Sequence, residues 1–538
     1  MVDQLNSGAM PVFVQPAGRW RQFCILVSPA LVFALMFTPR FALGSDREAV
    51  QHFNLGNKAF QSGDLAQAER EYRVALRIDP AMIDARQNLA ITLAQEGDLD
   101  RAAEELRTVL AARPNSAEAH YNLGHVLFQQ KKDMAALAEF QKAVKLKPNY
   151  PEAMNNVALL LERTGDKETA MAEFRSLLAA SPRYAEARNN FGEMLANEGK
   201  LDEAIVQFHE AIKLRPDFSQ AHENLGLALV KKRDTEGARS EFQKAADLGS
   251  ADAYLSLGVL LGENGELDAA IRAHQEAVRL MPDDPMAHFL LGGGLQQKGD
   301  LDGAISEYRQ VLRLDPQFSS ADLNLGVALR EKGDLGKAAS ALEAARRISP
   351  DNPEVHYQLG VTLSRSGDVP RAVDEMRRAV ALKPNYSQAF YGLGQTLRRM
   401  GKLEEAQEAF GRVEQLHRAD AEFAQANTQY NLGLAALAKG NRDAAQKAFE
   451  TALAIKPDFA EAHTNLGAIL LARGETRNAI GQFRAAIDAK PDDARAYYNL
   501  GLALEKAGDS AAAHAAFQQA LKLDPQLKTS APDRQEGK

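Results

Sequence analysis

The sequence predicts an all-α fold, an α-solenoid in which about 14 tandem helical hairpins wind into a right-handed superhelix. A leading Gly or Ala recurs along the chain, and eleven of its thirteen spacings equal 34 residues. In twelve units a Gly follows the leading residue after seven positions, and in twelve a Pro follows it after 24. A fixed period of this length indicates stacked repeats, because each unit buries its apolar face only against its neighbours. The leading residues stand at positions 56, 90, 124, 158, 192, 226, 258, 292, 326, 360, 394, 433, 467 and 501.

Each unit is predicted to contain two short helices. Apolar or small residues recur at intervals of three and four, as at Leu89, Ala90 and Leu93, which is the spacing of an amphipathic helix. A Gly such as Gly97 ends the first helix, because it adopts a positive φ at little cost. The carboxylate of the following Asp98 can cap the second helix. The Pro near the end of the unit stops that helix, since its ring cannot continue the hydrogen-bond ladder.

The third unit shows a family pattern. An aromatic residue, a Leu-Gly pair, a large apolar residue, an Ala, a second aromatic, another Ala and a final Pro stand at His120, Leu123, Gly124, Leu127, Ala136, Phe140, Ala143 and Pro148. This order resembles the tetratricopeptide repeat (TPR) family, and the resemblance covers residues 49–527. It implies an interaction scaffold that binds a protein or an extended peptide. We number the units as repeats 1 to 14, each with a first and a second helix.

The N-terminal segment is typical of a signal peptide. Arg19 and Arg21 precede an apolar run over residues 23–37, and small residues follow up to Gly44. The run is shorter than the ~20 residues that a membrane-spanning helix needs. The sequence therefore predicts export to the periplasm or the exterior, with residues 1–44 removed. The alternative, favoured by the long polar lead, is an uncleaved segment that anchors the chain in a membrane.

The charge balance limits the kinds of partner. The chain has 72 acidic and 64 basic residues, a formal net charge of -8. This argues against general binding of nucleic acids or anionic membranes, which needs a basic surface. The single cysteine, Cys24, lies in the predicted signal segment, so the processed chain would have neither disulfides nor thiol chemistry.

Two irregular repeats divide the array. Repeat 6 lacks its Pro and is two residues short, and repeat 11 lacks its Pro and gains five residues between 414 and 425. The predicted blocks are residues 49–250, 251–425 and 426–527, followed by a polar tail, 528–538. The inserted stretch has no Gly or Pro, which favours a longer second helix over a loose linker. We expect a change of superhelical phase at both sites, and the alternative is harmless variation in length.

An asparagine recurs two residues before the leading residue in ten repeats. This pattern resembles the asparagine ladder of O-linked N-acetylglucosamine transferases, whose repeat superhelix comes with a catalytic domain that is not visible here. The resemblance implies that the amides hold the backbone of an extended polypeptide on the concave face. An amide offers a donor and acceptors for this purpose. The alternative is a role in helix packing, with the amides satisfying each other. All repeats of the first block have this residue: Asn54, Asn88, Asn122, Asn156, Asn190 and Asn224.

Aromatic residues stand one position before the asparagine position in several repeats, including Tyr121, Tyr357 and Tyr391. Aromatic side chains with a polar edge suit recognition surfaces. The alternative is packing against the neighbouring helix.

Arg365 and Arg398 are predicted to lie near the ends of first helices, in a stretch with 13 basic and 8 acidic residues between positions 330 and 402. An acidic partner segment would fit this surface. The alternative is a solvated basic face.

Other signatures are absent or incomplete. The Lys that a chaperone-binding clamp needs is missing, and no phosphate-binding loop motif occurs. Six histidines share one repeat position but never occupy adjacent repeats, so we predict neither a metal site nor a cofactor. The final helix, near Leu521 and Leu523, is followed by too short a tail for a polar cap, so self-association at the C-terminal repeat is possible.

These observations predict a non-catalytic, exported scaffold that binds extended polypeptide in the concave groove, within an envelope assembly or export complex. The alternative function is a substrate-recognition subunit of a separately encoded glycosyltransferase or other enzyme. No catalytic residues are predicted.

Overall fold

The protein is described by a computed structural model that covers residues 45–525 and residue 527. The predicted signal peptide and polar tail lie outside these residues. Within them the elements are 27 α-helices, and no strand is present. The all-α prediction is therefore confirmed. None of these helices combines the length and the apolarity that a membrane crossing requires.

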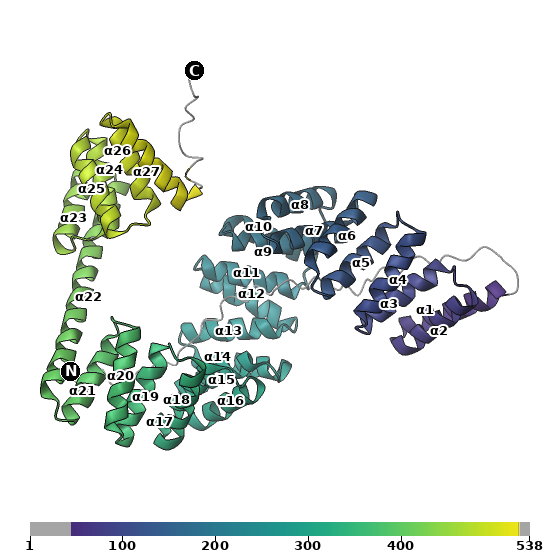
Figure 1. The fold of residues 1–538 in the computed structure, drawn as a ribbon, viewed down its shortest axis with the longest axis horizontal. Helices are drawn as coiled ribbons and strands as arrows, with labels where there is room; N and C mark the ends of the chain where they lie inside the picture. The colour runs from purple at the N-terminus through teal and green to yellow at the C-terminus, as the bar shows by residue number, and fades with distance from the viewer. Residues whose placement is uncertain (1–44, 526, 528–538) are drawn as a thin grey trace. The chain divides into compact units, whose positions relative to one another are not determined.

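Successive helices pair into antiparallel hairpins with the repeat order expected from the sequence (Figure 1). Repeats 1 to 8 are α1 Ser45–Gln61 with α2 Leu65–Ile78, α3 Ile83–Gln95 with α4 Leu99–Ala112, α5 Ala117–Gln129 with α6 Asp133–Leu146, α7 Pro151–Arg163 with α8 Lys167–Ala180, α9 Ala185–Asn197 with α10 Leu201–Leu214, α11 Ser219–Lys231 with α12 Thr235–Asp247, α13 Ala251–Glu263 with α14 Leu267–Leu280, and α15 Pro285–Lys298 with α16 Leu301–Leu314.

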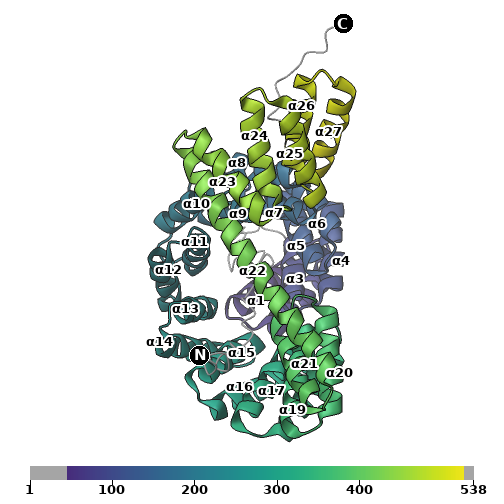
Figure 2. The same ribbon diagram turned by 90° about the vertical axis from the view of Figure 1, so that its left-hand side faces the viewer.

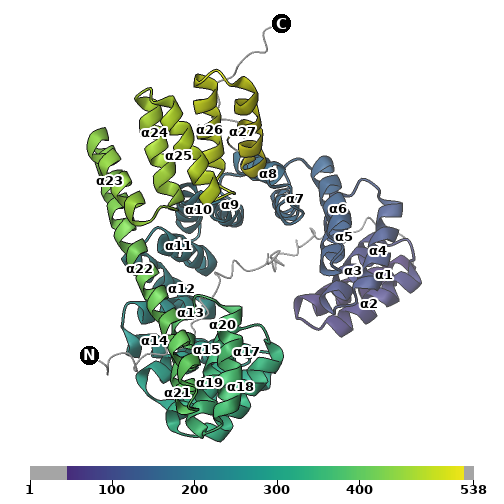
Figure 3. The same cartoon turned by 60° about the vertical axis from the view of Figure 1, so that its left-hand side comes forward.

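The remaining repeats follow the same plan with one exception, the long helix α22. They comprise α17 Ser319–Lys332, α18 Leu335–Ile348, α19 Pro353–Ser366, α20 Val369–Leu382, α21 Ser387–Arg399, α22 Leu403–Ala438, α23 Arg442–Ile455, α24 Ala460–Ala472, α25 Thr476–Ala489, α26 Ala494–Lys506 and α27 Ser510–Leu523. Figure 3 shows α24 to α27 side by side.

The turn inside each hairpin has the predicted chemistry. Gly97 has a φ of 85°, and the carboxylate of Asp98 accepts a hydrogen bond from the Arg101 backbone N–H. The two repeats without this Gly adopt the same turn, with φ of 60° at Lys131 and 63° at Arg233. The stacked helices on either side therefore impose a left-handed residue even where the side chain opposes it.

The core of a repeat depends on the small leading residue. A Cβ atom at Gly124 would lie 2.8 Å from Cδ1 of Phe140, which is fully buried on the second helix of the same hairpin. The first helix thus approaches the second so closely that only a small leading residue fits between them. This explains why the leading residue is Gly or Ala throughout.

The first irregular repeat is closed by a tight turn. Helix α12 ends at Asp247, Gly249 has a φ of 88°, and Ser250 caps α13 by accepting from the Ala253 N–H. Buried alanines of α12 and α13 share a small core there, so these two helices pack directly.

The second irregular repeat contains one unbroken helix. The 36 residues of α22 include the second helix of repeat 11, the five added residues and the first helix of repeat 12 (Figure 2). The predicted longer helix is confirmed. It also explains why 14 repeats contain 27 helices.

The chain separates into two compact units, with the division between Ala328 and Leu329 inside α17. This division coincides with neither irregular repeat. The three blocks inferred from the sequence stay a prediction.

Candidate polypeptide-binding surface

In about half of the junctions the first helices of neighbouring repeats contact each other, whereas successive second helices make no comparable contact within the described residues. This holds for α3 with α5, α7 with α9, and α9 with α11. The first helices therefore lie closer together and form one continuous side of each local stack. We call this side the first-helix face, and all the predicted binding residues belong to it.

Several ladder asparagines bond to the neighbouring first helix. The side-chain N–H of Asn190 donates to Oδ1 of Asn155 at 2.9 Å, and that of Asn224 donates to Oδ1 of Asn189 at 3.1 Å. Asn88 makes a similar bond of 2.8 Å to Asn57. These bonds join adjacent repeats, which agrees with the packing alternative for these donors.

The other ladder positions differ from one another. Asn54 is exposed on the first repeat, whereas Asn122 and Asn156 are buried. Nδ2 of Asn122 is buried without a hydrogen-bond partner among the described residues, and so is Nδ2 of Asn189. A role for these amides in holding a ligand stays a prediction.

The three predicted tyrosines pack against other rings. The Tyr121 ring lies 5.0 Å from the ring of Tyr150, and the Tyr357 ring lies 5.2 Å from that of Tyr386. Both tyrosines are half-buried, and burial raises the pKa of the Tyr121 phenol to about 12. Tyr391 differs because 48% of its surface is exposed. It offers the largest open aromatic surface of the three.

The basic stretch between positions 330 and 402 contains arginines that hydrogen-bond to neighbouring repeats and arginines that are exposed without an ion pair. Arg330 is buried and donates to Oε1 of Gln358 at 2.6 Å, and Arg399 donates to the carbonyl oxygen of Ser364 at 2.9 Å. Arg365 and Arg398 are exposed, and neither forms an ion pair among the described residues. These two guanidinium groups are available to an acidic ligand.

Carboxylates that the sequence analysis did not single out lie on the first-helix face of repeats 4 and 5. Burial and, to a lesser extent, the charges of Glu162 and Glu223 raise the pKa of the Glu193 carboxyl group to about 8. Burial also raises the pKa of Glu162 to about 7, although Asn197 donates to it. Neither Glu162 nor Glu193 forms an ion pair with Lys or Arg in the part of the chain that the structure describes. Neither residue belongs to a repeated sequence pattern, because the two occupy different positions in their repeats.

The repeated histidines hold hairpins together. Nδ1 of His120 lies 2.5 Å from Oε2 of Glu139 on the second helix, and its Nε2 lies 3.1 Å from the carbonyl oxygen of Pro114. Four other repeats contain an equivalent His-Glu pair. Both ring nitrogens of His120 are therefore engaged, one within the hairpin and one with the connection that precedes it. Among the described residues no group of three potential metal ligands occurs.

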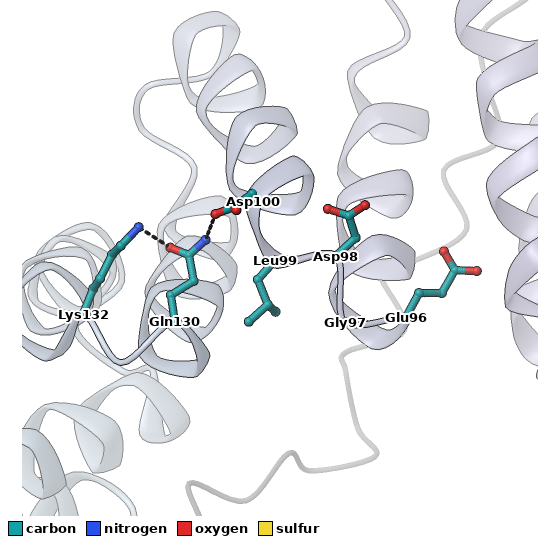
Figure 4. Close-up of a pocket in the computed structure, with 7 residues that line it drawn as sticks. All are labelled: Glu96, Gly97, Asp98, Leu99, Asp100, Gln130 and Lys132. Carbon is teal, nitrogen blue, oxygen red and sulfur yellow. Dashed lines mark hydrogen bonds between the residues drawn. The ribbon is translucent and has the colours of Figure 1, made fainter.

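A separate hollow lies at the hairpin turns of repeats 2 and 3, away from the predicted binding residues (Figure 4). Acidic groups from the first turn border it, and the second contributes Gln130, which donates to Asp100 at 2.8 Å and accepts from Lys132 at 2.9 Å. Asp100, Gln130 and Lys132 thus bond to one another, and Asp98 caps its own helix by accepting from the Arg101 backbone N–H. The hollow therefore adds no candidate site.

Comparisons with known proteins agree with the repeat pattern. Models described as tetratricopeptide repeat or TPR repeat match residues 88–151, 134–185, 156–208, 192–232, 294–353, 329–380, 385–458 and 469–528. A search of curated protein sequences found no match.

Solved structures of repeat proteins are similar to parts of the chain. A TPR protein named YrrB, with an unusual peptide-binding site, is 28% identical over 34% of this chain and 95% of its own, with a TM-score of 0.31. A TPR protein from Parabacteroides merdae is 18% identical over 46% of this chain and 99% of its own, with a TM-score of 0.40. The APC/C Cut9–Hcn1 assembly is 16% identical over 85% of this chain and 96% of the matched one, with a TM-score of 0.33. The matched models and the helical hairpins together show that this chain belongs to the tetratricopeptide repeat family.

Proposed function

We propose that this chain is an exported, non-catalytic scaffold whose first-helix face binds an extended polypeptide. TPR proteins serve as protein–protein interaction scaffolds, and helical hairpins occupy the chain from Ser45 to Leu523. A stack of this kind presents similar positions at regular intervals along one face. Such a surface suits a partner that is itself extended and periodic. We further propose that the scaffold acts within an envelope assembly or export complex.

The observation that carries the proposal is the pair of carboxylates on consecutive first helices, Glu162 and Glu193. Their raised pKa values show that burial makes the charged form costly. An ammonium or guanidinium group placed beside them would favour the charged form and recover that cost. The partner segment over repeats 4 and 5 is therefore expected to carry Lys or Arg.

The alternative role, as a substrate-recognition subunit of a separate glycosyltransferase, was motivated by the asparagine ladder. Three of the ladder amides donate to neighbouring helices, at Asn88, Asn190 and Asn224. One N–H of each of these amides is therefore engaged within the protein. The structure therefore offers no specific observation in favour of this role over a general scaffold.

Binding is tested with an array of extended peptides that differ in their content of Lys, Arg, Asp and Glu. The double variant Glu162→Gln, Glu193→Gln is compared with Glu168→Gln, Glu203→Gln, which makes the same charge change at exposed positions of second helices. The wild type and the control should both prefer basic peptides, and the first variant should lose that preference. A folded wild-type chain, checked by circular dichroism, that binds no peptide would refute the proposed function.

Export is tested separately, by determining the N-terminus of the chain produced in a cell envelope. A chain that begins at Ser45 supports cleavage after Gly44. Recovery of the uncut chain in the membrane fraction supports the anchor alternative, and recovery in the cytosol contradicts both.

A further inference from the structure

The stack of repeats is interrupted within the second unit, between repeats 11 and 12. The apolar residue just before the leading residue packs against the preceding repeat, and in twelve repeats at most 8% of it is exposed. The exceptions are Leu55 in repeat 1, at 39%, and Leu432 in repeat 12, at 55%. Repeat 12 therefore presents the open front of a repeat that begins a stack.

The opposite side of the same interruption shows the complementary feature. The large residue 16 positions after the leading residue lies on the second helix, and in twelve repeats at most 2% of it is exposed. The exceptions are Phe517 in the last repeat and Phe410 in repeat 11, which are only partly buried. Repeat 11 therefore presents the open back of a repeat that ends a stack.

An ordinary junction shows what these two surfaces lack. Phe449 of repeat 12 shares a core cluster with Leu466 and Ile469 of repeat 13. The corresponding residues at the interruption are Phe410, Leu432 and Ala435. Phe410 packs against a core cluster made of residues from repeats 10 and 11, and 55% of the Leu432 surface is exposed. Because α22 is one straight element between them, it holds the two surfaces apart.

The front of repeat 12 also lacks the polar cap of a true first repeat. In repeat 1 the exposed front includes Gln51 and Lys58, whereas repeat 12 has Thr428 and Ala435 at the same positions. The Thr428 hydroxyl donates to the carbonyl oxygen of Ala424 in its own helix, at 2.9 Å. The exposed Asn431 is the polar group that remains on this front, which carries no charge at the positions of Gln51 and Lys58. End repeats normally carry polar outer faces.

We propose that a second copy of the chain covers both surfaces by a reciprocal exchange across α22. Repeat 11 of each copy stacks on repeat 12 of the other, so that Phe410 of one chain packs against Leu432 of its partner chain. A two-fold arrangement forms both junctions at once and leaves neither surface open. A second copy fits both surfaces, because stacking its repeat 11 on repeat 12 rebuilds the kind of junction that repeats 12 and 13 form within one chain. This pairing is distinct from self-association at the C-terminal repeat and does not depend on the proposed function.

The first test measures the mass of the purified full-length chain by analytical ultracentrifugation. The wild type is expected to be a dimer, and Leu432→Glu a monomer with an unchanged circular dichroism spectrum. The milder Leu432→Ala should raise the dissociation constant by roughly tenfold or more, because two partly exposed leucines become buried per dimer. Two matched controls, Leu55→Glu at the same position of repeat 1 and Val206→Glu at another exposed site, should stay dimeric. A monomeric wild type, a dimeric Leu432→Glu variant or a monomeric Leu55→Glu variant would overturn the proposal.

The second test identifies which surfaces meet. With Cys24 replaced by Ser, one chain carries Phe410→Cys and another carries Leu432→Cys, and the two are mixed and treated with a short bismaleimide. A covalent product that joins the two different chains supports the exchange. A chain that carries both substitutions and crosslinks only within itself would show a closed monomer with a broken α22. Crosslinking of Leu432→Cys to Phe517→Cys instead would show end-to-end stacking, and either result would refute the reciprocal exchange.

Discussion

Replacing Glu193 by Gln should stabilise the first unit, and the gain should grow with pH. The carboxyl group has a pKa of about 8 in the folded protein, against 4.5 as its ordinary value. The folded state therefore binds a proton between these two values that the unfolded state has released. Stability must fall as the pH rises through this window, because each unit of pH favours the state with fewer protons.

The magnitude follows from the difference between the two pKa values. At 1.36 kcal/mol per pH unit, the folded region loses about 3 kcal/mol between pH 4.5 and pH 7, and about 4 kcal/mol by pH 8, where the folded state is itself half deprotonated. Glutamine is neutral at every pH and has nearly the shape of the protonated acid. The variant and the wild type should thus be equally stable near pH 4.5, and the variant should be more stable by several kcal/mol at pH 8.

Hydrogen exchange is the appropriate assay, because repeat arrays open locally and a global unfolding curve averages over many repeats. Exchange protection in α7, α9 and α11 is measured for both proteins from pH 5 to pH 8, after correction for intrinsic exchange rates. The control is Glu203→Gln, an exposed carboxylate on α10. The reasoning fails if Glu193→Gln shows no gain in protection at pH 8, or the same gain at pH 5.

Three changes to turn and core positions give further predictions, all measured by urea unfolding followed by circular dichroism. Lys131→Gly should stabilise its repeat by about 1 kcal/mol, because Lys131 has a φ of 60°, which Gly adopts without strain. The control variant Lys132→Gly should give no gain, because Lys132 has a negative φ. Gly124→Ala should destabilise by roughly 1–3 kcal/mol, because the new Cβ would stand 2.8 Å from the Phe140 ring. Gly411→Ala should instead stabilise α22 by about 0.5–1 kcal/mol, since nothing lies within 4 Å of its Cβ position. A gain in stability for Gly124→Ala would contradict this account of the leading residue, and a loss for Gly411→Ala would contradict the open space at that position of α22.

The candidate site was only partly predictable. The sequence placed Tyr121 and the ladder asparagines on first helices, because helical periodicity depends on residues three and four apart. It left open whether an amide faces a ligand or a neighbour. For Asn88, Asn190 and Asn224 the neighbour that accepts the hydrogen bond lies 31 to 35 positions away, as Asn155 does for Asn190, and for the other ladder asparagines the question stays open. Glu193 could not be predicted for a related reason. Its pKa is raised by burial between adjacent repeats, and no local sequence motif indicates that burial.

The amino-acid sequence by itself determined the repeat period, the family, the hairpin turns and the helical character of the insertion in repeat 11. Each of these follows from contacts within one hairpin or from the conformational limits of Gly, Asp and Pro. Only the tertiary structure decided that α22 runs unbroken into repeat 12 and leaves Leu432 uncovered. The Leu before the leading Gly has the same neighbours in sequence as its counterparts elsewhere in the array. Its exposure depends on whether the preceding repeat packs against it, and a helix of 36 residues keeps that repeat away.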